Sequence, residues 1–125
     1  MSVTLVTPVT TLLIPFIAPS KGANMSVREN KYQAGLIKRI TARFPHCMIL
    51  KNDPNYIQGV PDLIVLCDGR WAMLEVKASA KASHQPNQDH YVARLNHMGF
   101  ARFVYPENEV EVLRDLEAYF GQEYL

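Results

Sequence analysis

The dipeptide Asp68-Gly69 constrains the fold of this chain more than any other feature, because it is a tight-turn signal at the centre of the short connection between two apolar runs. The first run is Leu63-Ile64-Val65-Leu66, and the second extends from Trp71 to Ala78. Asp-Gly between two such runs is typical of a β-hairpin with a tight two-residue turn. A turn of that length also fixes which residues face each other, so that Ile64 lies opposite Met73. We therefore predict an antiparallel hairpin of defined register.

This register brings two acidic side chains together at the open end of the hairpin. Asp62 faces Glu75, and directly opposed residues point to the same side of a sheet with Cβ atoms roughly 4.5–5.5 Å apart. Lys77, two residues further on, projects from the same face. Like charges at this separation repel each other, and a divalent cation with oxygen ligands would neutralise them. The alternative is that Asp62 only ends a loop and that Glu75 to Lys77 is an exposed alternating strand.

A carboxylate also lies on the apolar face of the first predicted helix. Ser26-Val27-Arg28-Glu29 is a capping box that opens a helix ending near Phe44. Helical spacing puts Glu29 on the same side as Leu36 and Ile40, which directs its carboxylate toward the sheet. The alternative role of Glu29 is the hydrogen bond of the capping box.

A later helix carries an amide in a similar position. It starts at Pro86, a residue that suits the first helical turn, and ends at Gly99. Gln88 shares a face of this helix with Tyr91 and Leu95. Gln88 is therefore either a satisfied core amide or a group that reaches the carboxylate cluster.

The remaining segments complete one mixed domain. We predict strands at 46–51 and 100–105, polar loops at 52–59 and 79–85, and a last helix at 109–120. The resulting order, α-β-β-β-α-β-α, indicates an α/β fold in which a small mixed β-sheet is flanked by helices. A chain of 125 residues with 48% hydrophobic content has room for one such domain.

The first 24 residues are not assigned to this domain. Residues 1–20 carry no charged side chain, but Pro8, Pro15 and Pro19 interrupt the stretch and no basic region precedes it. This pattern argues against a membrane span and against a secretory signal. Because Met25 is followed at once by the helix start, we expect residues 1–24 to be an extended arm or a leader translated from an upstream start codon. The functional domain is then 25–125.

The two cysteines, Cys47 and Cys67, each stand beside aliphatic residues and lack a second cysteine at zinc-ligand spacing. The four histidines show no paired metal-ligand pattern either. We expect both cysteines to be buried free thiols, because a disulfide framework uses more cysteines and an oxidising compartment.

The string Gly59-Val60-Pro61-Asp62, followed after a turn by Glu75-Val76-Lys77, resembles the motif of the PD-(D/E)xK nuclease superfamily. The wider pattern is similar to the VRR-NUC branch, which carries a Glu on the first helix and a Gln near the start of the helix after the Glu-x-Lys strand. Glu29 and Gln88 occupy these positions. The resemblance covers roughly residues 25–120 and implies a restriction-endonuclease-like core.

The resemblance implies metal-dependent hydrolysis of phosphodiester bonds. Mg²⁺ or Mn²⁺ would be held by Asp62, Glu75 and the backbone carbonyl of Val76, with Glu29 binding directly or through water. Lys77 would orient the attacking water and stabilise the transition state. Gln88 would hold the water or the scissile phosphate. The implied catalytic set is therefore Asp62, Glu75, Lys77, Gln88 and Glu29.

DNA, branched or duplex, is the expected partner. Residues near the proposed mouth of the site would contact it, namely Lys31, Lys38, Lys51, Tyr56 and Lys81. For each lysine the alternative is a solvated surface, and Tyr56 either stacks on a base or covers the edge of the core. Cutting two strands would need two active sites, hence a homodimer. The expected location is the cytoplasm of a bacterium or a phage-infected host cell, with no membrane association.

Three functions remain open at this point. The first is a structure-selective DNA endonuclease, with a Holliday-junction resolvase as its most specific form. The second is a catalytically silent nuclease-fold module that binds nucleic acid without cutting it. The third is an interaction protein that docks through its acidic C-terminal helix.

The net charge of +1 conceals an uneven distribution of charge along the chain. Residues 21–105 hold twelve basic and six acidic side chains, whereas residues 106–125 hold one basic and six acidic ones. Three acids of the first part are the proposed metal ligands Glu29, Asp62 and Glu75. The near-neutral average therefore combines a basic body with an acidic tail, and it does not exclude a nucleic-acid enzyme.

Overall fold

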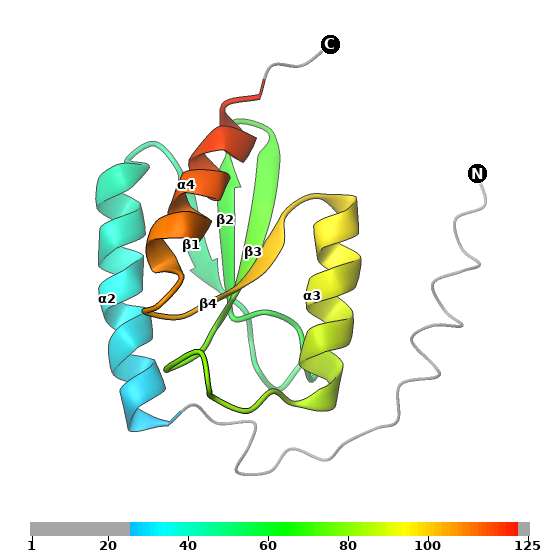
Figure 1. The fold of residues 1–125 in the computed structure, drawn as a ribbon. Coiled ribbons are helices and arrows are strands. Elements are labelled where there is room, and N and C mark those ends of the chain that lie inside the picture. The colour runs from blue at the N-terminus through cyan, green and yellow to red at the C-terminus, as the bar shows by residue number, and fades with distance from the viewer. Residues whose placement is uncertain (1–25, 123–125) are drawn as a thin grey trace, which may run out of the picture.

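The computed structural model describes residues 26–122, so the predicted arm at 1–24 lies outside the described residues. The elements, labelled as in Figure 1, are α2 (Val27–Arg43), β1 (Met48–Lys51), β2 (Leu63–Cys67), β3 (Arg70–Val76), α3 (Pro86–Met98), β4 (Ala101–Val104) and α4 (Glu109–Phe120). Their order confirms the predicted α-β-β-β-α-β-α arrangement and the α/β class.

The four strands form one mixed sheet in the order β1-β2-β3-β4. The first two pairings are antiparallel, and β3 pairs with β4 in parallel. The central hairpin has the predicted register, with Ile64 opposite Met73 and Cys67 opposite Arg70. Asp68 and Gly69 have φ angles of 48° and 84°, and positive φ at both central residues defines the type I′ turn expected of Asp-Gly.

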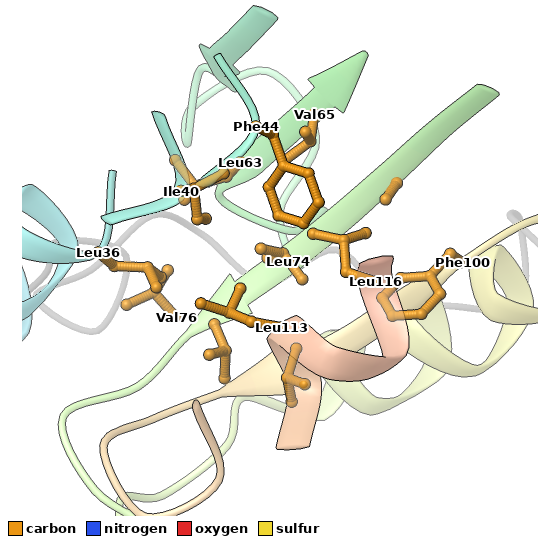
Figure 2. Close-up of a cluster of buried hydrophobic side chains, with 13 residues drawn as sticks. Leu36, Ile40, Phe44, Leu63, Val65, Leu74, Val76, Phe100, Leu113 and Leu116 are labelled. Carbon is orange, nitrogen blue, oxygen red and sulfur yellow. The ribbon is translucent and has the colours of Figure 1, made fainter. Parts of the chain in front are cut away.

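Helices α2 and α4 cover one face of the sheet and α3 lies against the other (Figure 1). Figure 2 shows the core between helices α2 and α4 and the sheet. Leu36 and Ile40 of α2, four residues apart, meet Leu63 and Leu74 of the hairpin, and Leu116 of α4 closes the cluster. All five side chains are fully buried. The alternation of the strands then turns Glu75 and Lys77 toward the α3 side.

Ion pairs join α2 to α4 along their exposed sides. Arg39 Nε lies 2.6 Å from Glu109 Oε2, and Arg43 Nη2 lies 2.7 Å from Glu117 Oε1. The hydroxyl of Tyr32 also donates to Glu109 Oε1 at 2.7 Å. Two acids of the C-terminal helix are therefore engaged within the fold, which leaves less of that helix for docking a partner.

The prediction of two free thiols is wrong. Cys47 and Cys67 form a disulfide, with Cα atoms 4.5 Å apart. Met48 pairs with Leu66 in the β1–β2 ladder, and continuing this register by one residue sets the two cysteines directly opposite each other. A long loop separates β1 from β2, so their register was not accessible from the sequence. His46 lies beside the pair, but sulfurs bonded to each other are not the thiolates that bind metals.

Between residues 26 and 122, no helix combines the length and the apolar character needed to cross a membrane.

Candidate metal centre

Asp62 precedes β2 and is fixed by hydrogen bonds from both neighbouring strands. Its Oδ2 accepts a hydrogen bond from the Val76 backbone N–H at 2.8 Å. Its carbonyl accepts from the Asn52 backbone N–H at 2.8 Å, and the Asn52 amide Nδ2 donates to the Pro61 carbonyl at 2.7 Å. The paired register ends at Leu63 and Leu74, and the Asp62 carboxylate reaches across to the end of β3 through its hydrogen bond with Val76.

The ionisable side chain of Glu75 is almost completely buried, with 1% of its surface exposed. Its Oε2 accepts a hydrogen bond from Gln88 Nε2 at 2.8 Å. Its Oε1 is buried and has no hydrogen-bond partner. In the protonated form Glu75 can share its proton with Asp62, whereas in the ionised form this buried oxygen is unsatisfied and offers a ligand atom to a cation.

Glu29 completes the cluster from the first turn of α2. Its backbone N–H donates to Ser26 Oγ at 3.0 Å, which caps the helix. Its side chain is half-buried beside the two strand carboxylates. One oxygen from each of Glu29, Asp62 and Glu75 lies within 4.8 Å of the others. The carboxylate therefore belongs to the cluster, as the apolar face of the helix predicted.

Lys77 and Gln88 are hydrogen-bonded to each other next to this cluster. Lys77 is 5% exposed, and its Nζ donates to Gln88 Oε1 at 2.7 Å and to the Ser83 carbonyl at 3.1 Å. It also lies 3.8 Å from Glu75 Oε2. The Gln88 oxygen accepts a further hydrogen bond from the Gln85 backbone N–H at 2.8 Å. Gln88 thus reaches the cluster instead of being satisfied in the core, and it bridges Lys77 to Glu75.

Without a cation, burial disfavours the ionised form of all three carboxyl groups. Burial, and then the charge of Asp62, raises the pKa of Glu75 to about 9. Burial also raises the pKa of Asp62 and the pKa of Glu29 above their ordinary values. Lys77 opposes these shifts without cancelling them. A divalent cation would supply the missing positive charge.

The donor set fits a hard divalent cation. Three carboxylates converge from α2, from the start of β2 and from β3, and one of their oxygens has no other partner. Mg²⁺ and Mn²⁺ prefer such oxygen ligands. Val76 gives its N–H to Asp62, and the role of its carbonyl as a further ligand stays a prediction.

The predicted DNA contacts are all exposed, but they differ in distance from the cluster. Lys31 lies two residues after Glu29, Lys51 pairs with Leu63 next to Asp62, and Lys81 follows β3 in the loop to α3. The segments around these lysines and around Tyr56 lie at the same end of the molecule (Figure 1). Lys38 lies further away, about 13 Å along the α2 axis from Glu29.

Two contributors to the site were not anticipated. Asn52 holds the backbone on either side of the Pro61–Asp62 bond, and Ser83 accepts a hydrogen bond from Lys77 through its carbonyl. Contacts made with backbone atoms leave no residue-specific pattern, so no spacing in the sequence pointed to Ser83. Asn52 lay in a segment assigned only as loop, and its role depends on the β1–β2 pairing.

Comparison of the chain with protein-family models, with curated proteins and with solved structures finds no match. The functional argument therefore rests on the site itself.

Proposed function

We propose that this protein is a metal-dependent, structure-selective DNA endonuclease of the PD-(D/E)xK type, similar to the VRR-NUC branch. The observation that carries the proposal is the convergence of Glu29, Asp62 and Glu75, with ligand atoms within 4.8 Å of one another, beside the buried Lys77. Once Glu75 is ionised, its buried Oε1 has no hydrogen-bond partner among the described residues, and a bound cation would supply one.

The residues divide the chemistry among them. Asp62, Glu75 and Glu29 would hold Mg²⁺ or Mn²⁺, which when bound lowers the pKa of a coordinated water and neutralises charge at the phosphoryl group. Gln88 fixes Glu75 by donating to Oε2, so that Oε1 is directed to the cation site. Only carboxylates in their ionised form bind the cation, so the proton that burial favours on Glu75 must leave.

Lys77 is positioned to act on the reacting groups. An ammonium group has three N–H donors, and Lys77 uses two of them on Ser83 and Gln88. The remaining donor can hold the attacking water or stabilise the charge that grows on the phosphate in the transition state. Both hydrogen-bond partners are neutral oxygens, and the ion pair of Lys77 Nζ with Glu75 Oε2 at 3.8 Å keeps the ammonium group beside the cluster where the substrate would bind.

Substrate selection would follow the structure of the DNA. The site is bordered by exposed lysines and by Tyr56, which can contact the DNA backbone and an exposed base. We propose branched DNA such as a four-way junction as the most specific substrate, cut by a homodimer that supplies two sites. The proposed setting is the cytoplasm of a bacterium or a phage-infected cell, where cellular reductants would keep the Cys47 and Cys67 thiols reduced, so that their disulfide would form only under oxidising conditions.

The test is a panel of labelled four-way junction, flap, duplex and single-stranded DNA incubated with Mg²⁺. We expect cleavage that EDTA abolishes and that falls by about 100-fold or more in Asp62→Asn and in Lys77→Ala. Arg114→Ala, which changes an exposed residue of α4, is purified in parallel and should cleave normally.

Each outcome of the panel has a definite meaning. Symmetrical paired nicks in the junction support the resolvase form, and indifference among the four substrates removes it. Metal-dependent cleavage that persists unchanged in Lys77→Ala would reject the proposed site. Tight binding without any cleavage would instead identify the silent nucleic-acid-binding module.

A further inference from the structure

A cavity of about 410 Å³ lies in the loop between β1 and β2, next to the metal centre. Its lining consists of Asn52, Asp53, Tyr56, Ile57 and Val60. Asn52 connects the cavity to the cluster. It lines the cavity and is also hydrogen-bonded to the backbone carbonyls of Pro61 and Asp62. Its volume falls in the range of small-molecule sites, roughly 300–1,000 Å³.

The lining determines what this cavity accepts. Ile57 and Val60 are apolar, and Tyr56 is 81% exposed, so that its ring is available for stacking. Among the described residues no basic side chain lines the cavity, and Asp53 contributes a carboxylate. A phosphate would be repelled here, whereas a neutral aromatic group could stack on Tyr56 and give hydrogen bonds to Asp53 or Asn52.

The loop is held in place before any ligand arrives. Asp53 Oδ1 accepts from the Asn55 N–H at 2.9 Å, and its carbonyl accepts from the Tyr56 N–H at 3.2 Å. Gly59 has a φ of +98° and packs so closely on α3 that a Cβ there would lie 2.4 Å from Asn87 Cβ. A cavity fixed at both ends binds with little ordering cost.

We propose that this cavity takes one unpaired nucleobase of the substrate, stacked on Tyr56, next to the phosphate that the metal centre attacks. The inference rests on the proposed function and deepens it. A base in a continuous duplex must first leave its stack, whereas flaps and single strands offer unpaired bases without this cost. The bases at the centre of a four-way junction are paired, but stacking is interrupted at the crossover, which lowers the cost of extruding one of them. The cavity would therefore supply a preference for DNA with accessible bases over continuous duplex DNA.

The experiment measures binding and cleavage of a single-stranded oligonucleotide in which an abasic residue is moved through every position. Binding is measured with Ca²⁺ in place of Mg²⁺, and cleavage with Mg²⁺. We expect one position near the cut at which loss of the base weakens binding about tenfold, and Tyr56→Ala should cause the same loss. Combining the two should cost little more than either alone, because both remove one stacking contact.

Two variants serve as controls. Tyr56→Phe keeps the ring and should bind like the wild type. Met98→Ala, which removes another exposed side chain at the far end of α3, should change nothing.

The outcomes separate this inference from the proposed function. Cleavage with no sensitive abasic position, or losses that add in full, would overturn the base site and leave the nuclease intact. Binding with the expected base effect but no cleavage would overturn the nuclease and keep the base site. Absence of any binding would overturn both.

Discussion

At the scale of single residues, Glu75 has the most unusual environment in residues 26–122. It is almost completely buried, next to Asp62 and near Glu29, and its pKa is raised to about 9 by burial and by Asp62. An acid with a raised pKa binds a proton more tightly in the folded chain than in the unfolded chain. Its contribution to the free energy of unfolding is therefore present at low pH and is lost as the pH rises.

The first prediction follows from the direction of this pKa shift. Without metal, the stability of the protein should decrease between about pH 5 and pH 9, because the unfolded Glu75 titrates near 4.5 and the folded one near 9. Thermal unfolding in EDTA across this range measures the effect. Glu75→Gln should flatten the pH dependence, while Glu111→Gln, at an exposed position of α4, should not. A wild-type profile that rises with pH would contradict the assignment.

Added Mg²⁺ should reverse the trend, since the cation replaces the proton on Glu75. Its apparent affinity should increase with pH over the same range.

At the scale of elements, the sequence predicted what local signals determine. The Asp-Gly turn sets the register of β2 and β3, and this register is sufficient to bring the carboxylates of Asp62 and Glu75 within 4.8 Å of each other. Helical spacing likewise placed Glu29 and Gln88 toward the cluster. Each of these inferences depends only on residues close together in the sequence, either within one helix or across a two-residue turn.

Contacts between elements joined by long loops were missed, because local sequence signals do not determine how such elements pair. The loop from Asn52 to Asp62 leaves the β1–β2 register undetermined, so neither the Cys47–Cys67 disulfide nor the Asn52 hydrogen bonds were foreseen. The pairing of Arg39 with Glu109 joins residues 70 positions apart and was equally inaccessible.

The disulfide gives the prediction at this scale. It closes a loop with a sequence separation of 20, and cross-links of this length stabilise by roughly 3 kcal/mol. A thiol reductant should therefore lower the midpoint of urea unfolding of the wild type. The double variant Cys47→Ala, Cys67→Ala should start from the lower midpoint and should not respond to the reductant. Identical unfolding curves of the wild type with and without reductant would show that the bond contributes nothing.

At the scale of the whole molecule, the distribution of charge determines how DNA would approach. Two arginines of α2 are paired with acids of α4, so they contribute little to the field around the site. Lys31, Lys51 and Lys81 are exposed, and the segments that carry them lie at the same end of the molecule (Figure 1). A cation bound among the three carboxylates would increase the positive potential there further.

Each lysine that contacts a phosphate releases counterions, and the dependence of binding on salt counts such contacts. We expect Lys51→Ala and Lys81→Ala each to reduce the slope of log K against log salt by about 0.9 for duplex-containing DNA. Arg114→Ala is the control of equal charge and should leave the slope unchanged. Binding is measured with Ca²⁺ by fluorescence anisotropy between low and moderate salt. Lys38→Ala adds a geometric test, because Lys38 meets a phosphate only if the DNA extends along α2. Unchanged slopes in both Lys51→Ala and Lys81→Ala would mean that the DNA does not cross this end of the molecule.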